Sequence, residues 1–338
     1  MKKRNANKMV SLIKCGYAQY LVAGYIKLGL DPHPLIAESG LPSQLMDLDE
    51  AFIPHDSVKK LVSLLASELE VEQFKQLVKT ALQRNSVQRL VGEFRHCKTV
   101  RDALRETSNI YLHDSTNVDV GLDVTYGESW YWCKRKTEDS SEFVWSEVYA
   151  IAYIVELIRT LSRTDWQPSK IKVQSPNVEY HRAVISKTCQ YYVNDSKIEI
   201  YVEDVILDTE LHLPGRVLDR PLLEQDWYSS YTEKVFTALY PYAQDLDLTI
   251  ARSADLLKTS PRTLQRRLGE EGTTFRALKD SLMFTCAVEL MIEGYPLTHI
   301  ATQLSFSDLP QFSRSFKRVS GLSPQKYQMT ILNAGSIS

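Results

Sequence analysis

The sequence predicts a mixed α/β domain over residues 1–240, followed by an all-α domain over residues 241–338 with two helix-turn-helix units joined by a linker helix. Three observations lead to this prediction. Alternation of apolar and polar residues marks strands only before Pro221. The last part of the chain shows helical spacing alone, and one amphipathic pattern within it occurs twice at a constant offset.

The composition is that of an ordinary globular protein. The chain has 338 residues, 43% of them hydrophobic and 24% charged, which is enough for two domains with cores of their own. Its five cysteines form no CxxC pair, which favours reduced thiols over a disulfide framework or a zinc site. Lys14 and Lys27 interrupt the stretch from Met9 to Leu30. This stretch therefore predicts a folded helix and a cytoplasmic protein rather than a signal peptide or a membrane span.

The first domain combines helices and strands. Val58, Leu61 and Leu65 recur at helical spacing, and residues 118–126 alternate as in a strand, which Trp130–Cys133 continues after a turn. Further along, the patterns predict a helix at Phe143–Ser162, strands at Lys170–Ser175, Cys189–Val193 and Lys197–Val202, and a last helix at Gln225–Ala238. The Tyr240-Pro241 pair then places the domain junction near residue 240.

The first helix-turn-helix unit is predicted to begin with a short helix from Ile250 to Leu257. A turn at Lys258 and Thr259 follows. Ser260 and Pro261 then open a second helix, because Ser is a favoured N-cap residue and Pro is favoured at the first helical position. The order helix, short turn and capped helix is the order that such a unit requires.

The second helix of this unit has one polar and one apolar face. Arg262, Gln265 and Arg266 share the first, whereas Leu264 and Leu268 share the second. Arg can bind guanine and Gln can bind adenine in the major groove of DNA. Taken alone, however, the polar face also fits an ordinary solvated helix.

The pattern returns in a second unit, where Asp308 is expected to cap a helix that runs to about Ser320 with Phe312, Phe316 and Val319 on its buried side. The matching pairs, all at the same offset along the chain, are Leu264 and Phe312, Arg266 and Arg314, and Leu268 and Phe316. A repeat with matching apolar and basic faces is more specific than a single amphipathic helix, so it favours the DNA-reading interpretation.

A continuous helix is predicted between the two units, from Thr274 to Glu293. At a rise of 1.5 Å per residue it would span about 30 Å, close to the roughly 34 Å of one turn of DNA. One chain would then place its two recognition helices in successive major grooves.

Residues 241–330 resemble the DNA-binding domain of AraC-type transcription regulators, and the segments Phe306–Arg318 and Gly321–Pro324 carry the resemblance. It implies double-stranded DNA as a partner and allows RNA polymerase as another. The family usually has Gly where this chain has Ser305, and Lys258 occupies the equivalent turn of the first unit. Both residues are expected to need a positive φ or a slightly different turn, at a cost of about 1 kcal/mol. Gln328 replaces a usual Arg.

The predicted DNA contacts lie on both recognition helices. Bases are expected to be read by Arg262, Gln265, Arg266 and Arg314, and phosphates to be held by Arg267, Lys317 and Arg318. Leu309 and Pro310 limit hydrogen bonding where the second helix starts, so we expect more base contacts from the first unit. The complete predicted set is Arg262, Thr263, Gln265, Arg266, Arg267, Gln311, Arg314, Lys317 and Arg318.

The first domain is similar to the effector-binding and dimerisation domain of one AraC-type subgroup, which includes regulators of ornithine and methylmalonate-semialdehyde metabolism. The segments Cys189–Val193, Ile198–Ile200 and Leu207–Leu211 carry this second resemblance. It implies an arabinose-binding-like domain, a small-molecule effector and a homodimer, without identifying the effector. A ligand-independent domain that only oligomerises or contacts another protein stays open as the alternative.

Two further groups of residues in the first domain allow more than one interpretation. The aromatic residues Tyr126, Trp130, Tyr131, Trp132, Tyr149 and Tyr153 could line an apolar pocket, although we favour plain core for any one of them. His96, Cys97 and His181 could suggest a nucleophile or a metal site, but no metal-spaced pair and no phosphate-binding loop accompanies them. The sequence therefore predicts a regulator with no catalytic residue, metal or cofactor. A DNA-tethered enzyme with a low-pKa cysteine is the least favoured class.

Overall fold

The computed structural model describes residues 10–83, 87–111, 114–135, 143–211, 213, 230–245 and 248–332. Along the chain, an α/β part precedes an all-helical part, as the sequence predicts. Internal contacts group the chain into two compact units. The N-terminal unit comprises the described parts of Ser11–Leu41 and His55–Asp226. The C-terminal unit combines Val10 and Pro42–Pro54 with the described part of Trp227–Ser338. Contacts alone do not show which part folds independently, so the domain boundary at residue 240 stays a prediction.

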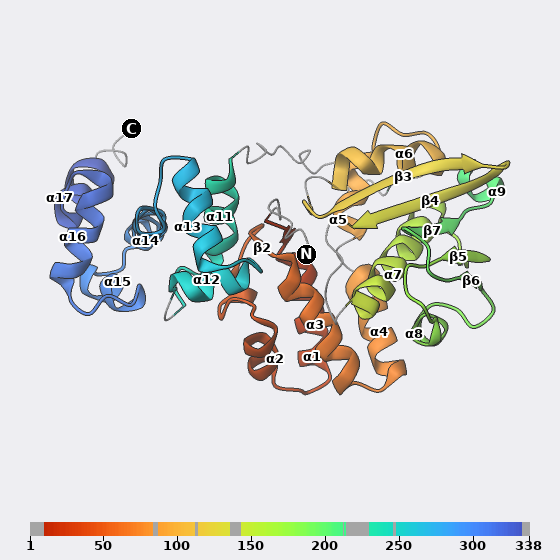
Figure 1. Ribbon diagram of the computed structural model, residues 1–338, viewed down its shortest axis with the longest axis horizontal. Coiled ribbons are helices and arrows are strands. Elements are labelled where there is room, and N and C mark those ends of the chain that lie inside the picture. Colours follow the sequence, from red (N-terminus) through yellow and green to blue (C-terminus); the bar gives the residue numbers. More distant parts are fainter. Residues whose placement is uncertain are drawn as a thin grey trace, which may run out of the picture. The chain divides into compact units, whose positions relative to one another are not determined.

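Most of the N-terminal unit is helical, and a five-stranded sheet forms the rest. Its longer helices are α1 (Gly16–Lys27), α2 (Pro32–Ser39), α3 (His55–Glu68), α4 (Val71–Ala81), α6 (Val100–Ile110) and α7 (Phe143–Ser162). Shorter ones are α5 (Val87–Val91), α8 (Glu179–Val184) and α9 (Asp204–Leu207), and a short strand β1 (Leu12–Lys14) comes first. The sheet follows the order β3 (Val118–Thr125), β4 (Glu128–Arg135), β7 (Ile198–Tyr201), β5 (Lys170–Lys172) and β6 (Gln190–Tyr192). Figure 1 shows α6 and α7 beside this sheet.

The predicted strands and the turn between the first two are confirmed. β3 and β4 form an antiparallel hairpin in which Val120 faces Cys133 and Leu122 faces Tyr131. Tyr126 and Gly127 form its turn with φ values of 53° and 77°, as the tightest hairpin turns require. Elsewhere in the sheet, β5 and β6 pair in parallel, whereas β7 is antiparallel to both β4 and β5.

The two faces of this sheet differ in chemistry. Val120, Tyr131, Cys133 and Ile200 point to one face and are buried there; the hydroxyl of Tyr131 donates to Thr107 of α6 at 2.9 Å. On the opposite face, Trp130, Trp132 and Tyr201 alternate with charged residues. Here the ammonium groups of Lys172 and Lys197 lie 4.1 and 4.5 Å from the ring centroids of Trp130 and Trp132. The strands are therefore amphipathic, with helices over the apolar side.

The C-terminal unit consists of helices, except for the short strand β2 (Phe52–Pro54). Its helices are α11 (Tyr231–Leu239), α12 (Ile250–Leu256), α13 (Pro261–Glu270), α14 (Phe275–Ile292), α15 (Leu297–Gln303), α16 (Leu309–Ser320) and α17 (Pro324–Tyr327). α11 is the described part of the last helix predicted for the first domain; residues 225–229 of that prediction lie outside the described residues. No helix in the described ranges is long and apolar enough to cross a bilayer.

A segment from early in the sequence belongs to this C-terminal unit. β2 packs against α11, and Ser43 donates hydrogen bonds to Oδ1 of Asp245 from its backbone nitrogen (3.3 Å) and its hydroxyl (2.6 Å). Nothing in the spacing of residues 42–54 distinguishes them from their neighbours in the sequence. The sequence therefore predicts them as part of the first domain.

Candidate nucleic-acid interface

The two predicted recognition helices, α13 and α16, begin in the same way. Ser260 caps α13 by accepting a hydrogen bond from the backbone nitrogen of Thr263 at 3.1 Å, and Asp308 caps α16 by accepting one from Gln311 at 2.6 Å. Each helix has Pro in its first turn, which suits the fixed φ of that residue. Ser260 and Asp308 are separated along the sequence by the same number of residues as the matching core and basic residues. The sequence repeat therefore includes the N-caps of the two helices.

The two turns before these helices also match. Thr259 N donates to Ala254 O at 2.8 Å and Phe306 N donates to Ala301 O at 2.9 Å, each closing a Schellman motif. Such a motif needs one residue in the left-handed region, and Lys258 (φ 48°) and Ser305 (φ 61°) occupy it. The positive φ expected for both residues is confirmed.

In α13 the polar face is exposed and the apolar face is buried. Leu264 and Leu268 are fully buried, whereas Arg262, Gln265 and Arg266 are exposed. Arg266 forms an ion pair with Glu270, one turn further along the same helix. The structure shows no hydrogen bond or ion pair for the side chains of Arg262 and Gln265 within the described ranges. Their polar groups are thus available to a partner.

Arg267 and Thr263 of α13 are half-buried and contact the protein itself. The Arg267 guanidinium lies 4.2 Å from the ring centroid of Tyr231, a cation–π contact with α11. The Thr263 hydroxyl lies 2.9 Å from that of Ser260, beside the helix cap. A carboxylate strengthens the same junction, because Glu271 accepts hydrogen bonds from the backbone nitrogens of Tyr231 (2.7 Å) and Thr232 (2.8 Å) at the start of α11.

In α16, Arg314 and Lys317 are exposed, and among the described residues no hydrogen bond or ion pair involves their side chains. Gln311 turns back toward the preceding loop, where its Oε1 accepts from the backbone nitrogen (2.9 Å) and hydroxyl (3.0 Å) of Ser307. Val319, predicted on the buried side, is 38% exposed, so that prediction is wrong. Helical spacing predicts which face of the helix carries Val319, but not how far along the helix a neighbouring element covers that face.

Arg318 is bound by the linker helix. Its Nε and Nη2 donate to the two carboxylate oxygens of Asp280 in α14, at 2.9 and 2.8 Å. Ser315 donates to the same carboxylate at 2.6 Å. Burial alone would raise the pKa of Asp280, but the hydrogen bonds from Arg318 and Ser315 outweigh it and hold that pKa below its ordinary value. The sequence did not single out Asp280, because an acidic residue on a helix is usually solvated.

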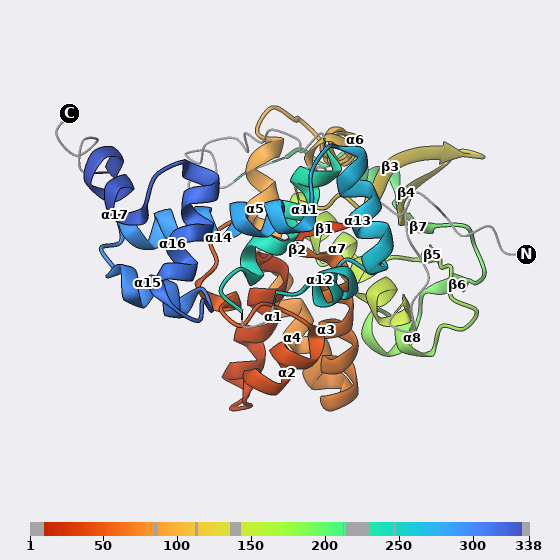
Figure 2. The same cartoon turned by 60° about the vertical axis from the view of Figure 1, so that its left-hand side comes forward.

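The linker helix α14 has 18 residues and is therefore about 27 Å long at 1.5 Å per residue. Figure 2 shows it lengthwise within the C-terminal unit. A cavity of about 440 Å³ lies along it, with Arg314 of α16 and also Arg276 and Lys279 of α14 in its lining. These last two basic residues were not predicted as part of the interface, although they lie one helical turn or less from Asp280.

An aromatic cluster joins α14, α16 and α17. The ring centroid of Phe316 lies 4.9 Å from that of Phe284, 5.3 Å from that of Tyr327 and 5.8 Å from that of Phe312. Contacts of this kind fix the position of α16 on the linker helix. The exposed Arg314 and Lys317 are thereby held on a rigid element.

The residues considered for catalysis in the first domain lie in different surroundings. His181 is fully buried and bonded at 3.0 Å to Glu147, which also accepts hydrogen bonds from Ser175. Burial raises the pKa of Cys97 to about 11, so its thiol stays protonated at neutral pH, and His96 beside it is exposed. Within the described ranges, no three His, Cys, Asp or Glu residues lie close enough to bind a metal ion.

The six aromatic residues of the first domain separate into four groups. Tyr126 is completely exposed at its hairpin turn, and Tyr131 is core. Trp130 and Trp132 lie on the charged face of the sheet. Tyr149 and Tyr153 of α7 line a cavity. Both are buried as well, so these two residues belong to the core and also line the cavity.

Two protein families match this chain. Residues 253–330 match a helix-turn-helix domain, and residues 29–193 match the N-terminal arabinose-binding domain of AraC transcription regulators. An HTH-type transcriptional regulator of Mycobacterium tuberculosis is 41% identical over 80 residues, which are 23% of either chain. The ornithine utilization regulator of Pseudomonas aeruginosa is 34% identical over 80 residues, 23% of this chain and 24% of that one. The matched stretch thus spans about a quarter of these curated relatives.

Among solved structures, the transcriptional regulator CdpR of Pseudomonas aeruginosa aligns with 93% of this chain and 98% of its own, at 14% identity and a TM-score of 0.41. The C-terminal domain of AraT, a response regulator from Geobacillus stearothermophilus, aligns with 29% of this chain and 84% of its own, at 28% identity and a TM-score of 0.27.

Proposed function

The chain is a transcription regulator of the AraC type, with an arabinose-binding domain before its helix-turn-helix domain, and we propose that it binds a specific operator in double-stranded DNA through α13 and α16. We also propose that a small-molecule effector controls this binding. One observation carries the proposal. Two equally capped helices, each exposing basic and amide side chains, are attached to one linker helix about as long as a turn of DNA.

Base reading is assigned to Arg262, Gln265 and Arg266 of α13 and to Arg314 of α16. The pair between Arg266 and Glu270 does not oppose this role, since both side chains are more than half exposed. An exposed pair of this kind contributes only about 0.5 kcal/mol, which a guanine contact can replace. Thr263 and Gln311, each third in its helix, would contact DNA at the helix starts.

Phosphate contacts are assigned to Arg267, Lys317 and Arg318. Arg318 binds Asp280 through Nε and Nη2, which leaves Nη1 for a phosphate oxygen and fixes the direction in which it points. Arg267 can keep its stacking contact with Tyr231 while its edge faces DNA. Both arginines would then be oriented by the protein before DNA arrives.

The proposal also covers the whole protein. A regulator of transcription that senses a metabolite acts in the cytoplasm, and the arabinose-binding match supports both an effector and a homodimer. Contact with RNA polymerase would follow for an activator. In the alternative, the N-terminal domain binds no ligand and serves only oligomerisation or protein contacts.

Selection of an operator from random-sequence duplex DNA with the full-length protein tests the DNA-binding part. On the selected site, Arg266→Ala is expected to cost about 1–3 kcal/mol and to relax specificity. Lys317→Ala should weaken binding to every sequence and lower the salt slope by about one. Arg163→Ala, an equal loss of charge in the N-terminal unit, is the control and should change neither. Unchanged selectivity in Arg266→Ala would refute the assignment of base reading.

A thermal-shift screen of metabolites against the full-length protein separates the two forms of control. A compound that raises the melting temperature and changes operator affinity supports effector control. If no compound changes operator affinity, the ligand-independent alternative is favoured.

A further inference from the structure

The N-terminal unit contains a cavity of about 90 Å³ on the helix-covered side of its sheet, which we call the tyrosine pocket. Four tyrosines line it: Tyr17 from α1, Tyr111 from the end of α6, and Tyr149 and Tyr153 from α7. The Tyr153 ring lies 5.9 Å from that of Tyr17 and 5.6 Å from that of Tyr111, measured between centroids. Aliphatic residues of β1, β3 and α7 form most of the remaining lining, so the walls are mainly ring faces and alkyl groups, and His55, Ser115 and Cys133 complete it.

Two hydroxyl groups of the tyrosine pocket are unpartnered. Tyr111 is 7% exposed and Tyr153 is 6% exposed; their hydroxyls lie near each other and near those of Tyr17 and Tyr131, but neither forms a hydrogen bond of normal distance and angle among the described residues. The hydroxyl of Tyr17, in contrast, donates to Oδ2 of the buried Asp114 at 2.8 Å. Because buried polar groups in proteins are nearly always hydrogen-bonded, two such groups lining one cavity indicate a ligand that bonds to them.

The chemistry of the lining restricts that ligand. The residues that line the pocket include no Lys, Arg, Asp or Glu, and His55 is the one lining residue with a basic side chain, so no permanent charge there compensates that of a carboxylate or an ammonium group. Burial raises the pKa of Tyr111 and Tyr153 well above its ordinary value, so both phenols stay neutral and can donate as well as accept. The small volume and the ring-lined walls fit one ring better than a longer molecule.

We propose that the tyrosine pocket is the effector site of this regulator, and that its ligand is a small uncharged molecule with one ring and a hydroxyl or carbonyl group that bonds to Tyr111 and Tyr153. The word effector rests on the function proposed above, whereas the ligand site rests on the pocket alone.

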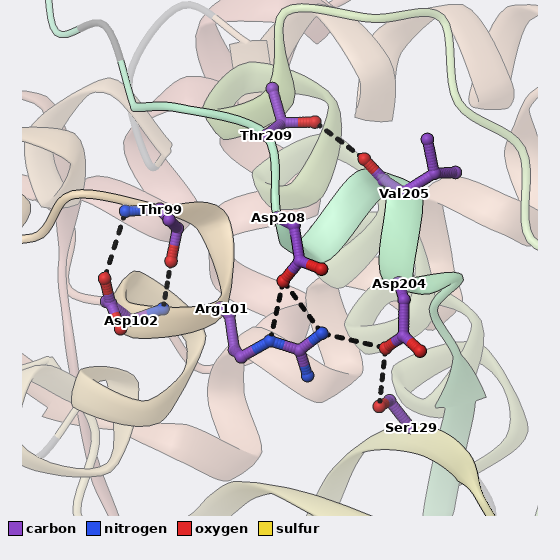
Figure 3. A network of polar contacts seen from close by, with 8 residues as sticks. All are labelled: Thr99, Arg101, Asp102, Ser129, Asp204, Val205, Asp208 and Thr209. Carbon is purple, nitrogen blue, oxygen red and sulfur yellow. Dashed lines mark hydrogen bonds and ion pairs between the residues drawn. The ribbon is translucent and has the colours of Figure 1, made fainter.

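The pocket is connected to the end of its own unit through α6. Tyr111 lies directly after the last residue of this helix. At the first turn, Arg101 binds Asp208 through Nε (2.9 Å) and Asp204 through Nη2 (2.8 Å), as Figure 3 shows. The backbone pairs there as well, because Leu211 N donates to Lys98 O at 2.8 Å. A ligand that moves Tyr111 therefore acts on a helix whose other end holds the last described residues before the C-terminal unit.

A second connection follows from the chain itself. His55, which lines the pocket, comes directly after β2, and β2 belongs to the C-terminal unit, where it packs on α11. Two pocket-lining residues, Ile13 and His55, thus lie within three positions of points where the chain passes from one unit to the other. This placement suits an effector site.

Binding of 4-fluorophenol to the full-length protein, followed by ¹⁹F NMR, tests the site. 4-Fluorophenol should bind at millimolar concentration or below, and 4-fluorobenzoate, which has the same ring but a charge, should bind at least tenfold more weakly. Ala150→Leu fills the pocket and should abolish binding. Ala152→Leu, two residues along α7 and lining a different cavity, is the matched control and should bind as the wild type does. Equal binding to both variants, or none to the wild type, overturns the site.

Tyr153→Phe provides a readout that a merely structural tyrosine would not give. Removal of an unpartnered buried hydroxyl should leave the melting temperature of the free protein equal or higher, while affinity for 4-fluorophenol falls about three- to tenfold. A lower melting temperature with unchanged affinity would show that the hydroxyl serves the fold, and would overturn the assignment.

The effector role is tested separately on the selected operator. 4-Fluorophenol should change the affinity of the wild type for this DNA, and Arg101→Ala should keep probe binding but lose that change. If the probe binds and operator affinity does not respond, the effector role is overturned. If the protein selects no operator at all, the function proposed above fails, and the ¹⁹F result on the ligand site stands by itself.

Discussion

The two helix-turn-helix units share their caps and their turns but are attached to the protein in different ways. α13 is joined to α11 through the stacking of Arg267 on Tyr231 and the capping by Glu271, contacts that lie at the surface. α16 is joined to α14 through an aromatic cluster and the Asp280–Arg318 pair, whose carboxylate is 14% exposed. Equal sequence patterns thus produce equal helices but not equal attachments.

The attachment of α16 also determines which of its basic residues have a partner within the protein. Arg314 and Lys317 face outward without a protein partner among the described residues, whereas Arg318, one position further, binds the linker helix. All three were predicted as DNA contacts, and those roles stay proposals. The contacts of these side chains distinguish Arg314 and Lys317, which are available to DNA, from Arg318, which also stabilises the fold.

The largest difference is expected for the core positions that correspond in the repeat. Phe316→Ala should destabilise the second unit by about 3–5 kcal/mol, because it removes the centre of the aromatic cluster. Leu268→Ala, at the matching position of the first unit, should cost about 2–3 kcal/mol. Hydrogen exchange of the helices in each unit measures both free energies of opening. An equal loss in the two units would remove the contrast between them.

Loss of the buried carboxylate is expected to be next in size. Asp280→Ala leaves Arg318 and Ser315 without their partner and should cost the second unit about 2–3 kcal/mol. Glu271→Ala in the first unit should cost about 1 kcal/mol, since its hydrogen bonds are at the surface. If hydrogen exchange in α16 of Asp280→Ala is as slow as in the wild type or slower, Asp280 does not attach α16 to α14.

Arg314→Ala and Arg318→Ala should separate DNA binding from stability. Arg314→Ala is expected to lower operator affinity by about 2 kcal/mol with an unchanged melting temperature. Arg318→Ala should lower the melting temperature as well, because Asp280 then loses its ion pair. Fluorescence anisotropy and thermal unfolding of both variants measure this, and identical melting temperatures would show that the pair with Asp280 contributes nothing to the fold.

Acid should weaken the attachment of the second unit. The pKa of Asp280 lies below its ordinary value in the folded protein, so its contribution to stability is complete above the unfolded pKa of about 4 and is lost as the pH falls through the folded pKa. Hydrogen exchange of α16 should therefore slow less between pH 5 and pH 3 than the intrinsic exchange rate does. Asp280→Asn removes the titrating group and should abolish this difference.

The smallest effects are expected at the two strained turns. Lys258→Gly and Ser305→Gly should each stabilise the protein by up to about 1 kcal/mol, since Gly adopts a positive φ without strain. Thr259→Gly, next to the first turn, is the control and should destabilise. Similar increases in the free energy of unfolding for both variants would show that the two turns are equivalent, unlike the attachments of α13 and α16.

Local sequence signals determined much of this fold. Ser260 with Pro261 and Asp308 with Leu309-Pro310 predicted two helix starts, and the family likeness predicted the left-handed residues Lys258 and Ser305. Alternation predicted the β3–β4 hairpin. Such features depend on neighbours within about five positions, which is the range over which caps, turns and periodicity act.

Only the tertiary structure decided which polar residues have partners. Asp280 and Arg318 are 38 residues apart, and Ser43 and Asp245 are 202 apart. No spacing rule connects such positions. The same applies to Tyr111 and Tyr153, which the sequence presents as two ordinary aromatic residues on separate helices. Their unpartnered hydroxyls and the pocket between them exist because long-range packing brought the end of α6 against α7, a contact that no local pattern encodes.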